Sequence, residues 1–132
     1  MITTRRIATA LTVLGAAFIF YIGISYLITP GIIVTGFGLP EWPTGDAAAF
    51  LNIKGVRDTV SGVVILALLA LGQRFALGVV MLVIALIPVG DMITVLSHHG
   101  SAATAFAVHG LTAVLVALTG LLLIRERPRG DR

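Results

Sequence analysis

The sequence contains no cysteine and few charged residues, and both shortages limit what the protein can be. Without cysteine, a disulfide framework and thiolate chemistry are excluded. Charged residues make up 11% of the 132 residues and hydrophobic residues 58%, and no charged residue occurs from Ile7 to Pro40. The rest of so short a chain cannot cover an apolar stretch of that length. We therefore expect lipid to be the solvent around it.

Four apolar segments follow one another along the chain, at about residues 7–29, 50–72, 75–97 and 102–124. Each would form about 35 Å of helix, which is enough to cross a hydrocarbon core about 30 Å thick. The sequence therefore predicts an all-α fold. We expect residues 1–132 to form a single four-helix transmembrane domain, with an outer loop at 30–49 that lies along the membrane interface and carries Trp42.

The positions of the basic residues predict the orientation in the membrane. Neither the loop at 30–49 nor the short connection HHGSA contains Lys or Arg, so both should face away from the cytoplasm. Both termini are then cytoplasmic, in a multi-pass protein that we expect in a bacterial plasma membrane. Because the basic residues form no continuous face, the high pI does not predict a nucleic-acid partner. Seven of the nine Lys and Arg residues lie on the predicted cytoplasmic side: Arg5, Arg6, Arg74, Arg125, Arg127, Arg129 and Arg132.

Polar residues recur at one depth in all four predicted helices. Counting from the cytoplasmic helix ends places them about 21–24 Å up, in the outer third of the bilayer. The residues at this depth are Tyr21, Arg57, Asp58, Asp91 and His109. Lys54 lies on the same helix face as Arg57 and Asp58, and lipid would penalise such a polar face unless it pointed into the bundle.

Buried charges at one depth need partners, and the sequence offers several. Arg57 and Asp58 are about 100° apart around their helix and are poorly placed to pair with each other. We expect Asp91 to pair with Arg57, because a guanidinium and a carboxylate can form two parallel hydrogen bonds. Asp58 then has Lys54, His109 or Tyr21 within reach.

Four short stretches carry a resemblance to a known family. KGVRDTVSG, QRFALG, IPVGD and AFAVHG resemble DUF4267, a family of small four-helix membrane proteins that are loosely similar in build to DoxX-like proteins. The resemblance covers the second to fourth helices, about two thirds of the chain. It implies the four-helix architecture and draws attention to Arg57, Asp58, Asp91 and His109, but it implies no reaction.

These residues predict a polar pocket for a small or lipophilic ligand, with possible proton-transfer chemistry at His109, Asp58 and Asp91. Two alternatives remain open. One is a structural or accessory membrane subunit whose charges form an interhelical salt-bridge network, and the other is transport of protons or small solutes. A second copy of the chain, in a homo-oligomer, is a candidate partner besides the lipid bilayer. We expect no cofactor and no metal site, because His98, His109 and Asp91 are metal ligands by residue type only and lack a ligand spacing. The ligand-binding candidates are Arg57, Lys54, Tyr21, Tyr26, Asn52, Thr94 and Trp42.

Overall fold

The computed structural model describes residues 3–126, and every regular element in this part of the chain is helical. The prediction of an all-α fold is thereby confirmed. Two long helices run without a break, α1 (Thr4–Ile28) and α3 (Ala49–Ala70). The other elements are α2 (Pro30–Ile33), η1 (Val34–Gly36), η2 (Gly45–Ala48), α4 (Arg74–Ile84), α5 (Leu86–Ser97), α6 (Ala102–Thr104), the π-helix η3 (Ala105–Gly110) and α7 (Leu111–Arg125).

Two segments differ from the predicted arrangement. The third predicted helix is interrupted between α4 and α5 at Ala85, three residues before Pro88, because proline has no N–H to donate and crowds the preceding turn. The predicted outer loop at 30–49 is not irregular throughout, since it contains α2, η1 and η2.

Three helical segments are long and apolar enough to cross a membrane by length and composition. They are Thr4–Ile28, Arg74–Ser97 and Ala102–Arg125. α3 is not among them, although it has 22 residues. It differs from the others in carrying Lys54, Arg57 and Asp58 in its first half.

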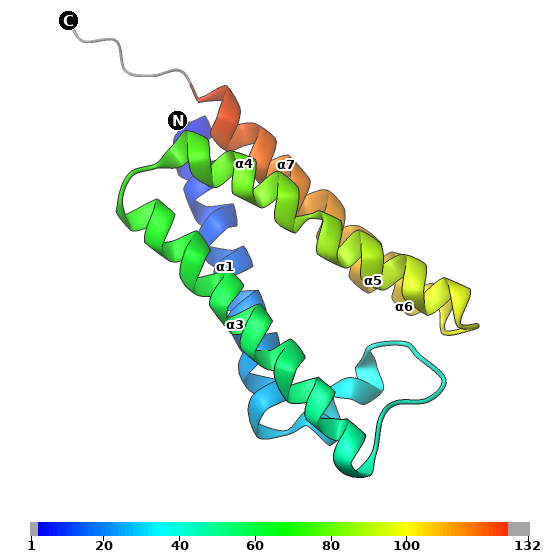
Figure 1. Ribbon diagram of the computed structural model, residues 1–132. Coiled ribbons are helices and arrows are strands. Elements are labelled where there is room, and N and C mark those ends of the chain that lie inside the picture. Colours follow the sequence, from blue (N-terminus) through cyan, green and yellow to red (C-terminus); the bar gives the residue numbers. More distant parts are fainter. Residues whose placement is uncertain (1–2, 127–132) are drawn as a thin grey trace, which may run out of the picture.

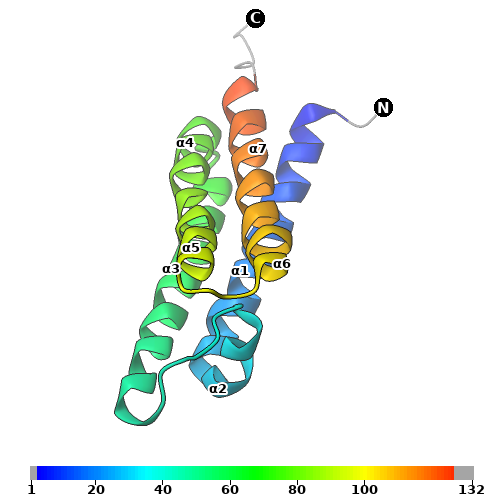
Figure 2. The same ribbon diagram turned by 90° about the vertical axis from the view of Figure 1, so that its right-hand side faces the viewer.

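The long helices pack as two pairs, which Figure 1 shows as two antiparallel couples that diverge from each other. We call α1 with α3 the first pair, and α4 and α5 with η3 and α7 the second pair. Between the pairs, α1 contacts α7 and α3 contacts α4. Figure 2 shows both ends of the chain on one side of the molecule, and α2 and the loop that follows it on the other.

Facing glycines allow the helices of each pair to approach closely. A Cβ atom on Gly55 of α3 would lie 2.8 Å from the carbonyl oxygen of Gly23 in α1. A Cβ atom on Gly120 of α7 would likewise lie 2.8 Å from the carbonyl oxygen of Gly78 in α4. Any side chain would force these backbones apart, so the four glycines set the spacing within both pairs.

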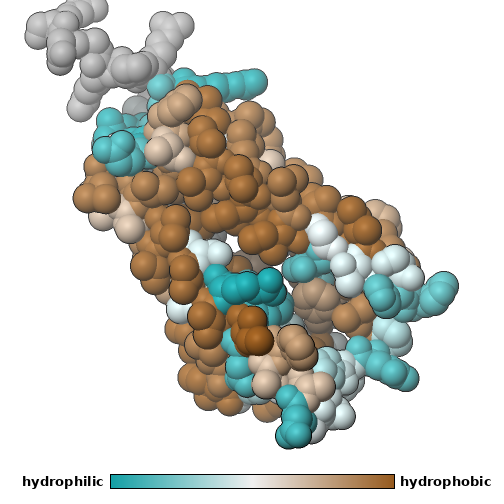
Figure 3. Space-filling model, viewed as in Figure 1, coloured by the Kyte–Doolittle hydropathy of each residue, from teal (hydrophilic) through white to brown (hydrophobic). Residues whose placement is uncertain are grey.

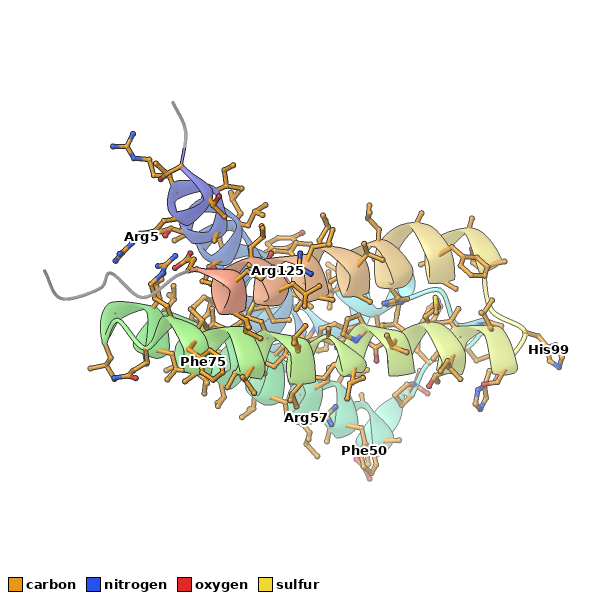
Figure 4. The ribbon with its side chains drawn as sticks, turned by 90° about the horizontal axis from the view of Figure 1, so that it is seen from above. Arg5, Phe50, Arg57, Phe75, His99 and Arg125 are labelled. Atoms are coloured by element: carbon orange, nitrogen blue, oxygen red, sulfur yellow. The ribbon has the colours of Figure 1, made fainter. Side chains whose placement is uncertain are left out.

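A basic cluster lies at the end of the molecule where the described part of the chain begins and ends. Arg74, at the start of α4, forms an ion pair with Glu126, and its guanidinium donates to Oε1 of Glu126 at 2.6 Å and to the carbonyl oxygen of Arg5 at 3.4 Å. These bonds connect the start of α4 with the end of α7 and the start of α1. Figure 4 shows Arg5 at this end and His99 at the opposite one. The remaining members of the predicted basic group, Arg127, Arg129 and Arg132, lie outside the described residues.

Candidate functional site

Lys54 and Asp58 form an ion pair on the inner face of α3. The Lys54 Nζ lies 2.8 Å from Oδ2 of Asp58, one helical turn further on, and the two side chains are only 19% and 7% exposed. The same ammonium lies over the rings of Tyr26 and Phe37, 5.1 and 5.5 Å from their centroids. The carboxylate and the two aromatic faces together replace the water that a buried ammonium loses.

His109 belongs to the π-helix η3, where the wider turn alters the direction of side chains relative to an α-helix. Its Nε2 lies 2.8 Å from the carbonyl oxygen of Phe37, and its ring packs on the Phe37 ring with 4.7 Å between centroids. A carbonyl oxygen can only accept a hydrogen bond, so Nε2 of His109 carries a proton and donates it. The other ring nitrogen, Nδ1, faces Oδ2 of Asp91 at 3.9 Å.

Asp91 lies on α5 three residues after Pro88, close to the interruption between α4 and α5. The hydrogen bond from the Val89 N–H to the Ala85 carbonyl is long, at 3.4 Å. The Asp91 side chain is 28% exposed, and within residues 3–126 its carboxylate accepts no hydrogen bond from side chain or backbone. Asp91 is therefore a carboxylate with free acceptor capacity beside an imidazole.

These polar side chains line a cavity between the two helix pairs. It has a volume of about 150 Å³, and its walls include Tyr26, Phe37, Lys54, Asp58, Asp91 and His109. A second cavity of about 380 Å³ has mostly apolar walls, among them Ile65, Met81 and Val116. The residues that line both cavities are Phe18, Ile19, Asp58, Ile87, Pro88 and Thr112. Figure 3 shows hydrophilic residues gathered beside a hollow in an otherwise largely hydrophobic face.

The predicted pair of Arg57 with Asp91 is not formed. Arg57 is exposed and makes no ion pair with any residue that the structure describes. The reason is the angle of about 100° between consecutive helical residues. Because Asp58 points into the molecule toward Lys54, Arg57 must point away from it.

The remaining predicted site residues fall into two groups. Tyr26 is buried and lines the polar cavity, and its backbone carbonyl accepts a hydrogen bond from Asn52 Nδ2 at 3.1 Å. Tyr21, Thr94 and Trp42 are exposed and line neither cavity. Asn52 therefore positions a wall residue, and the three exposed residues are not part of the site.

The three weak metal candidates do not form one group. His98 is exposed at the end of α5, and its Nδ1 lies 2.9 Å from the Thr94 carbonyl oxygen. In the part of the chain that the structure describes, no three His, Asp or Glu side chains are grouped so that they could hold one metal ion. Of the three candidates, Asp91 and His109 face each other, and His98 lies at the end of α5.

Phe37 is the main site residue that is absent from the predicted set. It contributes its aromatic ring and its backbone carbonyl oxygen. Every residue has a backbone carbonyl, so the residue type could not indicate that this one accepts a hydrogen bond. The next residue, Gly38, has φ +101°, and its carbonyl accepts a hydrogen bond from the Ser101 N–H at 2.8 Å. In the sequence, the available signal was a glycine directly after an aromatic residue in an apolar loop, because glycine readily adopts the left-handed conformation that the structure shows at Gly38.

The fold and the site define a class: a small all-helical protein with three helices apolar enough to cross a membrane and a charged cavity between its helix pairs. Within this class the chain belongs to the DUF4267 family, a domain of unknown function whose family model matches residues 16–123. The resemblance inferred from the sequence motifs is thus confirmed. The matched range contains Tyr26, Lys54, Asp58, Asp91 and His109. No curated protein and no solved structure matches the chain.

Proposed function

We propose that the four long helical segments form a membrane-spanning bundle with both termini on the cytoplasmic side. The cluster of Arg5, Arg74 and Arg125 at one end supports this orientation. α3 can join the bundle because Lys54 and Asp58 point inward, and its exposed face is apolar apart from Arg57. A cysteine introduced at Thr44 should react with an impermeant maleimide added outside the cell, and reaction only from the cytoplasmic side would contradict the orientation. The exposed large apolar residues of α3 are Phe50, Ile53, Val56, Val60, Val63, Val64 and Leu66.

We infer further that the protein binds a small amphiphilic ligand between its two helix pairs. One observation carries this function: a cavity with charged walls and a cavity with apolar walls share six lining residues. A ligand could place a polar group beside Asp91 and His109. Its apolar body would then lie among Ile65, Met81 and Val116. Proton transfer or transport would use the same place, since His109 and Asp91 face each other there.

The size of the apolar cavity argues against a purely structural network of charges. An interhelical network needs charges that pair between helices with no space beside them, whereas Lys54 and Asp58 lie one turn apart on α3 and both line the polar cavity. An apolar cavity of about 150 Å³ is already enough to bind benzene, whereas the one described here has about 380 Å³. Leu14, Leu111 and Leu115 on its walls are about half exposed or more, so the space opens to the surface of the molecule and a ligand could enter it from there.

Filling the apolar cavity should abolish ligand binding without unfolding the protein. Gly15 lines this cavity, and a Cβ atom on it would meet nothing within 4 Å. The Gly15→Leu side chain therefore enters the cavity, while the loss of a mid-helix glycine favours the fold by up to about 1 kcal/mol. We expect the wild-type protein in phosphatidylcholine nanodiscs to be labelled saturably by a diazirine-substituted benzyl alcohol, and Gly15→Leu to lose this saturable labelling.

Gly90→Leu is the matched control for this experiment. Gly90 is also a helical glycine with open space around its Cβ position, but it is exposed and lines neither cavity. Saturable labelling should therefore persist in Gly90→Leu at the wild-type level. Labelling that rises linearly with probe concentration, and equally in all three proteins, would show partition into lipid and would contradict a binding cavity.

A further inference from the structure

The chemistry of the polar group of the ligand follows from two hydrogen-bond acceptors that face each other. Nε2 of His109 donates to the Phe37 carbonyl, which leaves the neutral ring with a lone pair on Nδ1. This lone pair faces Oδ2 of Asp91 at 3.9 Å. Neither group can donate a hydrogen bond to the other, so each keeps an unused acceptor position. A group with two N–H donors could satisfy both of them.

The charges around the polar cavity favour a cation in that position. Besides His109, the Lys, Arg, Asp and Glu side chains on the walls are one base, Lys54, and two acids, Asp58 and Asp91. Lys54 and Asp58 neutralise each other at 2.8 Å. The negative charge of Asp91 remains, and burial among helices makes an uncompensated carboxylate costly.

The apolar cavity adds the second half of the ligand. Its walls come from α1, α3, α4, α5 and α7, and its volume of about 380 Å³ exceeds the roughly 150 Å³ that holds benzene. Because Ile87, Pro88 and Thr112 line both cavities, the apolar body can extend directly from the polar group.

We propose that the ligand is a primary or secondary amine with an apolar body about the size of an aryl-alkyl group. One N–H of the ammonium donates to Oδ2 of Asp91 and a second to Nδ1 of His109. A quaternary ammonium has the charge but no N–H, an alcohol has one donor and no charge, and a carboxylate is repelled by Asp91. This inference rests on the proposed binding function and specifies its ligand class.

Four compounds with one apolar body test the inference on the wild-type protein. Phenylbutylamine, phenylbutanol, phenylbutanoate and phenylbutyl-trimethylammonium would compete against the photolabel in nanodiscs of zwitterionic phosphatidylcholine. We expect the amine to displace the label at concentrations at least about tenfold lower than the alcohol or the quaternary ammonium, because charge-assisted hydrogen bonds are roughly twice as strong as neutral ones. Phenylbutanoate should be the weakest competitor.

Asp91→Asn should remove the advantage of the amine over the alcohol, because the amide is neutral and nearly the same shape. Asp46→Asn, at an exposed acid outside both cavities, should leave it unchanged. Equal displacement by amine and alcohol would overturn the amine inference and leave the binding function standing. Equal displacement by the primary and quaternary ammonium compounds would overturn the bridging geometry. Loss of saturable labelling in the wild type would instead contradict the binding function itself.

Discussion

Lys54→Met is expected to lower the free energy of unfolding by about 3–5 kcal/mol, which is typical of removing one partner of a buried ion pair. The Asp58 residue that would lose its partner is only 5% exposed, and the 2.8 Å contact with Lys54 is its only ion pair among the described residues. Methionine retains most of the lysine side-chain volume, so the change tests the charge rather than the packing. Denaturant- or heat-induced unfolding in a non-ionic detergent would measure the loss.

Two further variants test whether the loss of stability comes from the Lys54–Asp58 ion pair. Arg57→Met removes a cation from the same helix, but Arg57 is exposed and makes no ion pair within residues 3–126, so its effect should stay within about 0.5 kcal/mol. The double variant Lys54→Met with Asp58→Leu should recover much of the lost stability, because no uncompensated charge remains. If Arg57→Met is as damaging as Lys54→Met, Arg57 has a partner outside the chain and the inward pair is not the main stabilising contact.

Gly120→Ala is expected to destabilise the second helix pair by about 1–3 kcal/mol, the usual range for overpacking a tight contact. The new methyl group would lie 2.8 Å from the Gly78 carbonyl oxygen and 3.1 Å from Leu82 Cγ, and the first of these atoms belongs to the backbone of α4 and cannot rotate away. Relief requires the two helices to separate. Thermal unfolding of the purified protein would measure the effect.

We expect the same substitution at Gly90 to have the opposite effect on stability. Nothing lies within 4 Å of a Cβ atom built there, so only helix propensity changes, and the variant should gain up to about 1 kcal/mol. A Gly120→Ala protein that gains stability in the same way would show that α4 and α7 are not in close backbone contact.

The all-helical fold and the family could be predicted from the sequence, because both depend on features that are visible in the sequence itself. Apolar segments longer than 20 residues leave few alternatives to helices, and the family signal lies in short stretches such as KGVRDTVSG and AFAVHG. The four-helix membrane bundle and its orientation stay predictions. The distribution of Lys and Arg predicts the orientation, and labelling of a cysteine at Thr44 is the measurement that tests it.

Depth could be counted along each helix, but rotation about the helix axis could not. Asp58, Asp91 and His109 were placed in one layer by counting, and the structure brings them to one cavity together with Lys54. Arg57 has the same depth and points outward, because a difference of one residue turns the side chain by about 100°. Counting depth fixes the height of a side chain and leaves its direction open.

Irregular backbone geometry was the second feature that the sequence did not predict. The π-helix η3, which contains His109, and the Phe37 carbonyl that accepts its hydrogen bond both depend on backbone geometry. Pro88 was a visible signal, and the third predicted helix is interrupted near it, between α4 and α5. Nothing comparable in AFAVHG distinguishes a π-helical turn from an α-helical one.

The most direct measurement of a ligand cavity between the helix pairs is the position at which the photolabel attaches. After labelling at a saturating concentration in nanodiscs, mass spectrometry would identify the modified residues. The cavity predicts attachment at inner residues such as Ile19, Ile65 and Val116, which line it, and protection of these residues by excess unlabelled benzyl alcohol. Attachment confined to outward residues such as Val60, Val83 and Leu118, which are at least half exposed, with no protection by competitor, would contradict it.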